Sequence, residues 1–382
     1  MVPWSQPCIV KLRQDFVLRA LEPHANVSEL CREYGISRKT GYKWLERFKQ
    51  RGVIGLEDLS RRPNRSPLRA SGDAVLEILR LRGEHPRWGP RKLAVVAARV
   101  LGEDATPSVR TIARILERAG EVRRGRGATQ GERPTDAPST DLSECNERWT
   151  VDFKGWWRAG DGSRCEPLTV RDAVSRFVLC ARLVEDTRAE TIKGLFEGLF
   201  DEWGLPRAIQ VDNGSPFACT RARAGLTTLS AWWVSLGIEL IRGRPGHPQD
   251  NGAHERMHVD MRFDVEDLGA PTVAEQQAKL DQWRHEFNHV RPHEALDMQV
   301  PSAIYCRSPR RYMGPRPQRY PATLETRRVN PAGRVRYHGH ILRIGAGLRG
   351  FDVGLQRTGD LAVRAYFYEI DLGEIQLTQR RK

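Results

Sequence analysis

The sequence predicts a multidomain protein with two all-α N-terminal regions, an α/β centre and a small all-β C-terminal region. Three observations predict this class. Residues 1–121 repeat a helical periodicity broken by polar turns, the centre mixes strand-like and helical patterns, and the last stretch alternates apolar and polar residues between glycines. The chain of 382 residues is longer than one hydrophobic core normally organises, so several domains are expected.

The charge is distributed unevenly along the chain. The net charge of +14 comes from 27 basic against 18 acidic residues in 1–145, 19 against 24 in 146–306, and 16 against 6 in 307–382. Basic segments bind polyanions by releasing counterions, and nucleic acid is the commonest such partner. The acidic centre instead fits a site that needs carboxylates. The pattern predicts two basic arms around a carboxylate-bearing core.

Composition and cysteine usage indicate a cytoplasmic protein without a membrane partner. The mean hydropathy is −0.56, and no apolar run approaches the roughly 20 residues that cross a bilayer. The N-terminus lacks the apolar stretch of a signal peptide. The seven cysteines are widely spaced and form no C-x-x-C motif, which favours reduced thiols over a disulfide framework.

Residues 1–59 are predicted to form a helix-turn-helix DNA-binding domain. A helix over 7–20 is followed by a second helix capped by Asn26 or Ser28, and Ser37 caps a third. A helix, a short glycine turn and a second helix is the geometry that enters the major groove. An alternative is a plain three-helix bundle with a solvated basic face. The expected DNA contacts cluster at the start of the third helix: Arg38, Lys39, Thr40, Tyr42 and Lys43.

A second helix-turn-helix-like DNA-binding domain is predicted over 73–121. Its last helix is capped by Ser108 and carries Arg110 and Arg114 on its outward face. Two such units in tandem would contact a longer DNA site than one. Residues 122–145 are rich in Gly, Pro, Thr and charge, so they are predicted to be a linker.

The centre, 146–306, shows three antiparallel strands, a helix, a strand, a helix and a further strand, which describes a ribonuclease-H-like sheet. Asp152 lies in the first strand, and Asp212 ends the fourth, its neighbour in that sheet. Carboxylates brought together repel one another unless a cation binds them, and their oxygens suit Mg²⁺ or Mn²⁺. Glu255, on a helix that passes the same edge, is the candidate third ligand.

The C-terminal arm is predicted to consist of a linker and a small barrel. Residues 307–328 are basic and proline-rich without a helical period, so an extended linker along DNA is expected. Residues 329–382 alternate apolar and polar residues between glycines, which predicts about five short strands in an SH3-like β-barrel.

Four motifs carry a family resemblance. W-T-x-D with Asp152, V-D-N-G with Asp212, P-x-H-P-Q-x-N-G-x-x-E-R (245–256) and F-N-H-V-R-P-H-E-A-L (287–296) resemble the D-D-E core of insertion-sequence transposases and retroviral-type integrases. The resemblance implies that Asp152, Asp212 and Glu255 are catalytic residues that bind two Mg²⁺ or Mn²⁺ ions per active site.

The resemblance also implies a function. The expected protein is a DNA transposase that binds the terminal inverted repeats of its own element and performs metal-dependent cleavage and strand transfer. Its partner would be double-stranded DNA, bound by a homodimer or higher homo-oligomer. In the core, His247, Asn251 and Arg262 are expected near DNA, and His258 near a phosphate or the metal. The chain between the second and third carboxylates is longer than in many relatives, and 218–230 is predicted as a surface insertion.

Two alternatives come from other classes. The sequences His254-Glu255-Arg256-Met257-His258 and His285–His289 match H-E-x-x-H, the zinc-binding pattern of metallopeptidases. Neither match explains the aspartates or the basic arms. The second alternative is a catalytically inactive DNA-binding regulator, although all three carboxylates are present.

Overall fold

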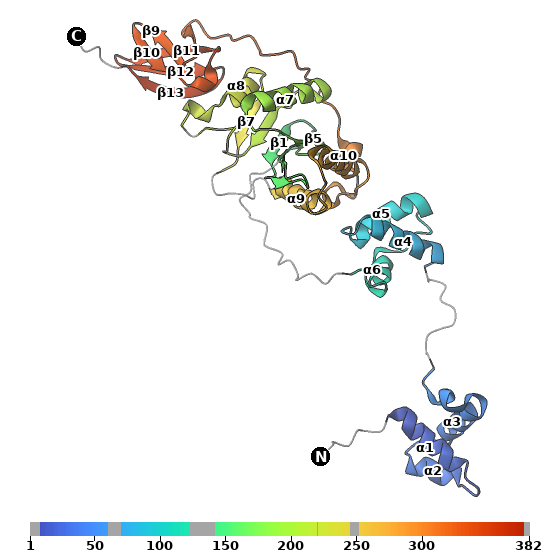
Figure 1. Ribbon diagram of the computed structural model, residues 1–382. Coiled ribbons are helices and arrows are strands. Elements are labelled where there is room, and N and C mark those ends of the chain that lie inside the picture. The colour runs from blue at the N-terminus through green and yellow to red at the C-terminus, as the bar shows by residue number, and fades with distance from the viewer. Residues whose placement is uncertain (1–7, 60–69, 123–141, 220, 245–251, 378–382) are drawn as a thin grey trace. The chain divides into compact units, whose positions relative to one another are not determined.

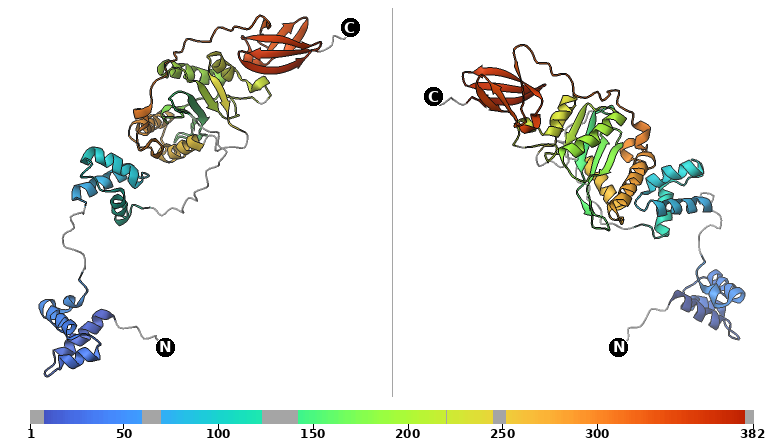
Figure 2. Two further views of the ribbon diagram at one scale, coloured as in Figure 1. Left: turned by 180° about the vertical axis from the view of Figure 1, so that it is seen from behind. Right: turned by 45° about the horizontal axis from the view of Figure 1, so that its top comes forward.

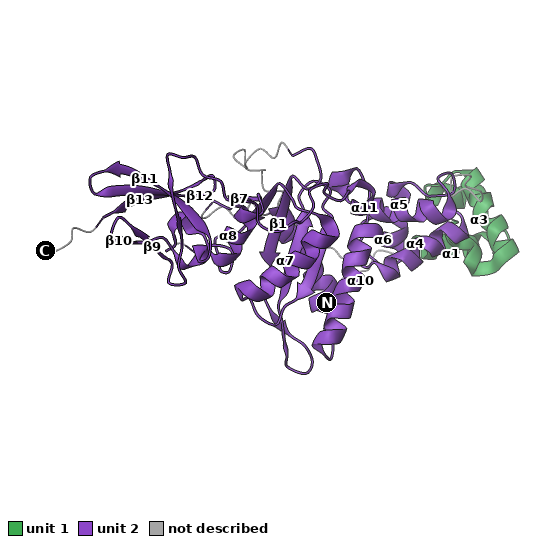
Figure 3. Cartoon of the chain, turned by 90° about the horizontal axis from the view of Figure 1, so that it is seen from above, with its two compact units in different colours: residues 1–69 green, residues 70–382 purple. Residues whose placement is uncertain are grey.

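The chain forms two compact units, residues 1–69 and 70–382 (Figure 3). The computed structural model describes residues 8–59, 70–122, 142–219, 221–244 and 252–377. His247 and Asn251, two predicted DNA contacts, and most of the predicted linker 122–145 lie outside these ranges. Within them, no helix is both long and apolar enough to cross a membrane.

The first unit contains three helices and a 3₁₀ turn (Figure 1). Two of its helices begin at the predicted caps, because Asn26 Oδ1 accepts the backbone N–H of Ser28 and Ser37 Oγ accepts that of Thr40. Gly41 allows close helix packing, since a Cβ there would lie 2.5 Å from the sulfur of Cys31. The elements are α1 (Ile9–Ala20), α2 (Val27–Glu33), α3 (Arg38–Arg51) and the turn Gly52–Leu56.

A second group of three helices opens the second unit. Ser71 caps the first of them and Ser108 the last, each accepting a backbone N–H three residues later. Their apolar faces share a core around Ile78, Leu93 and Ile112. Both helical N-terminal regions of the predicted fold class are therefore confirmed. The helices are α4 (Gly72–Glu84), α5 (Pro90–Leu101) and α6 (Val109–Arg118).

A five-stranded mixed sheet forms the centre, in the order β5-β4-β1-β6-β7. The central strand β1 pairs antiparallel with β4 and parallel with β6. A short hairpin, β2 (Trp157–Arg158) and β3 (Arg164–Cys165), follows β1. The sheet strands are β1 (Arg148–Phe153), β4 (Pro167–Asp172), β5 (Val178–Leu183), β6 (Ala208–Val211) and β7 (Glu239–Arg242).

Helices cover both faces of this sheet (Figures 1 and 2). On one face, α7 and α8 bury aromatic side chains against Trp149 and Ile209. On the other, α9 and α10 pack on Val178 of β5. This two-layered cover confirms the predicted α/β core. The helices are α7 (Ala189–Trp203), α8 (Thr228–Ser235), α9 (Gly252–Met261) with a π turn (Arg262–Glu266), α10 (Val273–His289) and the short α11 (Pro301–Ile304).

The C-terminal region is all-β, as predicted, and its described residues form six strands where about five were expected. They form a four-stranded antiparallel sheet, β13-β12-β11-β8, and a two-stranded one, β10-β9. The first strand begins at Glu325, so the predicted boundary at 329 is too late. The strands are β8 (Glu325–Arg328), β9 (Arg334–Tyr337), β10 (His340–Arg343), β11 (Asp352–Gly359), β12 (Ala362–Phe367) and β13 (Ile370–Gln376).

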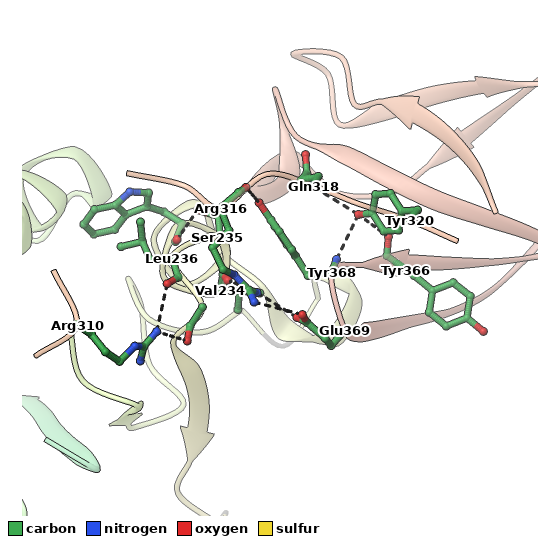
Figure 4. Close-up of polar contacts among 12 residues, drawn as sticks. Val234, Ser235, Leu236, Arg310, Arg316, Gln318, Tyr320, Tyr366, Tyr368 and Glu369 are labelled. Carbon is green, nitrogen blue, oxygen red and sulfur yellow. Dashed lines mark hydrogen bonds and ion pairs between the residues drawn. The ribbon is translucent and has the colours of Figure 1, made fainter. Parts of the chain in front are cut away.

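The predicted basic linker packs against its own protein. Arg310 donates to the carbonyl of Gly237 at 2.8 Å, and Arg316 donates to the carbonyl of Val234 at 3.3 Å and pairs with Glu369 at 3.1 Å (Figure 4). The Tyr368 hydroxyl donates to the backbone oxygen of Arg316. Arg316 thus ties the core to the β region, and Arg310 ties this stretch to the core. These two arginines contact their own protein, and the expectation that this stretch runs along DNA stays a prediction.

Two described residues of the predicted surface insertion 218–230, Arg223 and Leu226, contact the β region. Arg223 donates to the backbone oxygens of Arg343 and Glu374, both at 3.2 Å. Leu226 is buried in the hydrophobic cluster of the β region. These residues thus help to hold the β region on the core. Arg223 supplies hydrogen-bond donors to backbone oxygens of the β region, and Leu226 adds an apolar side chain to its hydrophobic cluster.

Candidate active site

The sheet brings Asp152 and Asp212 to one place. In the parallel pairing of β1 and β6, Thr150 is opposite Gln210. Continuing this register by two residues puts Asp212, the residue after β6, opposite Asp152. Side chains in parallel register lie on the same face of a sheet. The side chain of Asp152 is 20% exposed, and that of Asp212 is exposed.

Helix α9 is held on this same face through His254. The imidazole is fully buried, with Nδ1 at 2.8 Å from the hydroxyl of Thr150 and Nε2 at 2.7 Å from that of Thr169. Thr150 lies two residues before Asp152 on β1, and Thr169 is directly across from Asp152 on β4. The side chains of all three therefore lie on the face that α9 covers.

The hydroxyl of Thr169 connects three groups. It lies 3.0 Å from the backbone oxygen of Asp152, 2.7 Å from His254 Nε2 and 2.8 Å from His258 Nε2. A hydroxyl has one proton and two lone pairs. All three contacts are hydrogen bonds only if Thr169 donates to the carbonyl and both rings donate from Nε2. This pattern assigns the proton of each neutral ring to Nε2.

Both histidines are neutral. Burial, followed by the charges of His258 and Arg171, lowers the pKa of His254 well below its ordinary value. Burial, followed by the charges of Lys154 and Arg171, lowers the pKa of His258 to about 3. His258 Nδ1 lies 3.9 Å from Asp152 Oδ2, so at neutral pH this contact is not an ion pair. The unprotonated Nδ1 of His258 and Oδ2 of Asp152 are then two hydrogen-bond acceptors that lie near each other.

Glu255 lies in the first turn of α9, directly after His254, and is exposed. Among the residues that the structure describes, no three Asp, Glu, His or Cys side chains are grouped closely enough to hold a metal ion. The fold thus pairs two carboxylates and attaches the helix carrying the third to the same face. The donor set itself, carboxylate oxygens, suits Mg²⁺ or Mn²⁺.

The predicted DNA contacts of α3 and α6 are on the surface. The side chains of Arg38, Lys39, Tyr42 and Lys43 are exposed, and Thr40 is half-buried with its hydroxyl 2.9 Å from that of Ser37. On α6, the outward residues Arg110 and Arg114 are also exposed.

The two described residues of the core that were predicted to lie near DNA or metal differ in their exposure. Arg262, in the π turn after α9, is exposed and lies 3.6 Å from Asp267. His258 is only 11% exposed. Its position beside Asp152 fits the predicted place near a metal and leaves little surface for a DNA phosphate.

Sequence reasoning missed Thr150 and Thr169. Threonine in a strand is ordinary, because its β-branched side chain favours that conformation. An indirect signal was available. His254 and His258 lie on the same helix as Glu255, and buried histidines need hydrogen-bond partners on the sheet. The antiparallel register of β1 and β4 was required to identify them.

Comparison with known proteins agrees with this architecture. Two models described as "Integrase core domain" match residues 143–248 and 236–301. A "Helix-turn-helix domain" matches 12–64, and a "Homeodomain-like domain" matches 40–116. The chain is 27% identical over 241 residues to an uncharacterized 31.7 kDa protein of insertion element IS407 from Burkholderia multivorans, covering 59% of this chain and 78% of that protein.

Two solved structures are also similar to this chain. The HTLV-2 integrase catalytic core domain in complex with magnesium has a TM-score of 0.32 at 14% identity, covering 42% of this chain and 97% of that one. A simian T-cell lymphotropic virus intasome in complex with the PP2A regulatory subunit B56 gamma has a TM-score of 0.36 at 14% identity, covering 80% of this chain and 100% of that one.

The fold and the matched models define a protein with N-terminal helix-turn-helix domains and an integrase core. The family resemblance seen in the motifs is therefore confirmed. These matches support an insertion-sequence transposase with an integrase-like core.

Proposed function

We propose that this protein is a DNA transposase that binds the terminal inverted repeats of its own element, cleaves the DNA there and joins the ends to a target. The observation that carries the proposal is the pairing of Asp152 with Asp212 on the sheet face to which α9, with Glu255, is attached. Carboxylates brought together on one face repel one another, and a bound cation would relieve that repulsion.

Asp152, Asp212 and Glu255 would hold the divalent ions, two Mg²⁺ or Mn²⁺ per site. Bound there, the ions would supply Lewis acidity and a more acidic water or 3′-hydroxyl for attack on a phosphodiester. The chain's own residues do the positioning. Thr169 fixes the backbone at Asp152 through its carbonyl and fixes α9 through His254 and His258.

The helical regions would supply DNA recognition. Residues at the start of α3, with Arg110 and Arg114 on α6, are exposed and cationic or polar, which suits contacts with base edges and phosphates. Arg262 would contact DNA nearer the carboxylates, and His247 and Asn251 remain part of this proposal. Because two element ends must be joined together, we expect at least a homodimer on double-stranded DNA.

The first metallopeptidase match, 254–258, is disfavoured by one observation. His254, the first histidine of H-E-x-x-H, uses both ring nitrogens for threonine hydroxyls inside the core. Binding zinc through either nitrogen would break a buried hydrogen bond. An inactive regulator would differ from the proposal only in lacking chemistry, so a single activity assay separates the two.

The metal dependence of the purified full-length protein tests the function. With a duplex carrying the element end and a plasmid target, we expect end cleavage and joining with Mg²⁺ or Mn²⁺ and neither reaction with EDTA. Carboxylate sites of this kind also bind Ca²⁺, which should support assembly on DNA. Tight end binding with no joining under Mg²⁺ or Mn²⁺ would instead identify a regulator, and EDTA-resistant joining would refute the metal site.

The Thr169→Val substitution should damage both stability and activity. It leaves two buried imidazole N–H groups without an acceptor, which costs about 1–3 kcal/mol of unfolding free energy. Because Thr169 orients the groups around the proposed metal site, strand transfer should fall by about 10–100-fold. Thr169→Ser keeps the hydroxyl and should restore most activity. Equal activity of the valine and serine variants at a temperature where both are folded would show that the hydroxyl positions nothing.

A further inference from the structure

A cationic cavity of about 400 Å³ lies in the second unit beside the first turn of α9. It is formed by β4, the turn after it, α9, the segment 291–295 and the start of α5. None of the three proposed catalytic carboxylates lines it. Its walls carry two carboxylates, Asp260 and Glu294, against six cationic side chains: Arg87, Lys92, Arg171, Arg176, Arg256 and Arg291.

Arg171 forms the floor of this cavity and is incompletely bonded. Its side chain is buried, and Nη1 donates to the backbone oxygen of Ala253 at 2.8 Å. Its Nε has no hydrogen-bond partner in the part of the chain that the structure describes. Burial, followed by repulsion from Arg176, lowers the pKa of Arg171 to about 10. A buried guanidinium with a free donor is costly, and an anion would offset that cost.

Arg291, which also lines the cavity, repeats this arrangement. Nη2 donates to Asp260 Oδ2 at 2.7 Å, while Nε, also buried, lacks a partner among the described residues. Burial, followed by the charge of Arg291, lowers the pKa of Lys92 to about 8. Burial lowers the pKa of His293 to about 3, with Arg291, Lys92 and Arg176 among the further causes. The positive charges around this cavity thus repel one another across it.

We propose that this cavity is a phosphate-binding site, separate from the three carboxylates, in which Arg171, Arg291 and Lys92 hold a free phosphate ion or a phosphate of a DNA backbone. Guanidinium groups present donors in a planar fork that matches phosphate oxygens, and a lysine adds a point charge. Two wall carboxylates leave a cationic excess that suits a dianion. Binding of free phosphate in this cavity does not depend on the proposed transposase activity.

The reactivity of Lys92 toward an amine-acylating reagent tests the proposal in the full-length chain. Labelling would be measured by mass spectrometry in EDTA, which removes any metal from the carboxylate site. The ligands would be orthophosphate, duplex DNA, and chloride at matched ionic strength. Arg176→Gln removes one cation from the wall, and Arg182→Gln, on the exposed side of β5, is the matched control.

Orthophosphate, duplex DNA or both should slow Lys92 labelling about tenfold in the wild type and in R182Q. R176Q should need an about tenfold higher ligand concentration, since the wall of the cavity loses one positive charge. Protection by duplex alone assigns the site to the DNA backbone, and protection by orthophosphate alone assigns it to the free ion. Labelling of Lys43 on α3 reports separately whether the duplex is bound through the helix-turn-helix domain.

A second measurement guards against misfolding of R176Q. Phosphate should raise the thermal midpoint of the wild type and of Arg99→Gln, an exposed cation on α5, more than that of Lys92→Gln. Lys92 labelling that neither ligand changes, or equal ligand dependence in R176Q and R182Q, would overturn the proposal. The cations would then serve only the internal contacts with Asp260, Glu294 and Ala253.

Discussion

Replacing any one of Asp152, Asp212 and Glu255 with its amide is expected to reduce metal-dependent cleavage and strand transfer by about a thousandfold or more. A divalent ion contributes several kcal/mol to the transition state, and each loss of about 1.4 kcal/mol is tenfold in rate. The amide keeps the shape of the side chain and removes the charge that holds the ion. End binding should be unchanged, because the proposed recognition residues are carried by α3 and α6 and not by these three positions.

The matched controls are Asp201→Asn and Glu202→Gln, two exposed carboxylates on α7. α7 covers the opposite face of the sheet from α9, so these variants should retain wild-type rates. The readouts are single-turnover strand transfer and the binding of a labelled element end. If D152N, D212N or E255Q joined ends within tenfold of the wild-type rate, that residue would not be a catalytic carboxylate.

The second large effect is expected on stability, from Asp260→Ala. Asp260 and Arg291 are 6% and 9% exposed, and their 2.7 Å contact is a buried ion pair. Arg291 Nη1 also lies 3.8 Å from Asp264 Oδ2, a longer contact than the one with Asp260. Removing Asp260 leaves a buried guanidinium among other cations. The unfolding free energy of the core should fall by about 3–5 kcal/mol, measured in urea on the core transition.

Two further variants test the cause of that loss. Asp267→Ala removes an exposed partner of Arg262 and should cost at most about 1 kcal/mol. The double variant Asp260→Leu with Arg291→Met removes both buried charges together and should recover most of the lost stability. A loss below about 1 kcal/mol in Asp260→Ala would mean that Arg291 is compensated by other groups.

Much of the fold could be predicted from local pattern. The starts of three helices at Asn26, Ser37 and Ser108 follow from side chains that accept the first backbone N–H groups. The two strands that carry Asp152 and Asp212 could also be predicted, because each is a short apolar run within a specific motif. Asp152 lies inside its run, and Asp212 follows directly after its own. Local signals decided these features, so tertiary context was not needed.

Contacts between distant segments could not be predicted in the same way. Arg316 and Arg223 look like free cations in the sequence, but their contacts join the core to the β region. Arg310 likewise donates to a backbone oxygen of the core. Arg171 looks like a strand residue on a polar face, yet α9 buries it. Whether an arginine contacts DNA or its own chain depends on which carbonyls lie nearby.

The sequence by itself determined the order of domains, the caps, the central strands and the identity of three candidate carboxylates, because each rests on side-chain chemistry or on a period of a few residues. Only the tertiary structure decided that Thr169 joins Asp152 to both histidines of α9, and that six cations surround one cavity. These arrangements depend on strand register and helix packing, which bring together residues far apart along the chain.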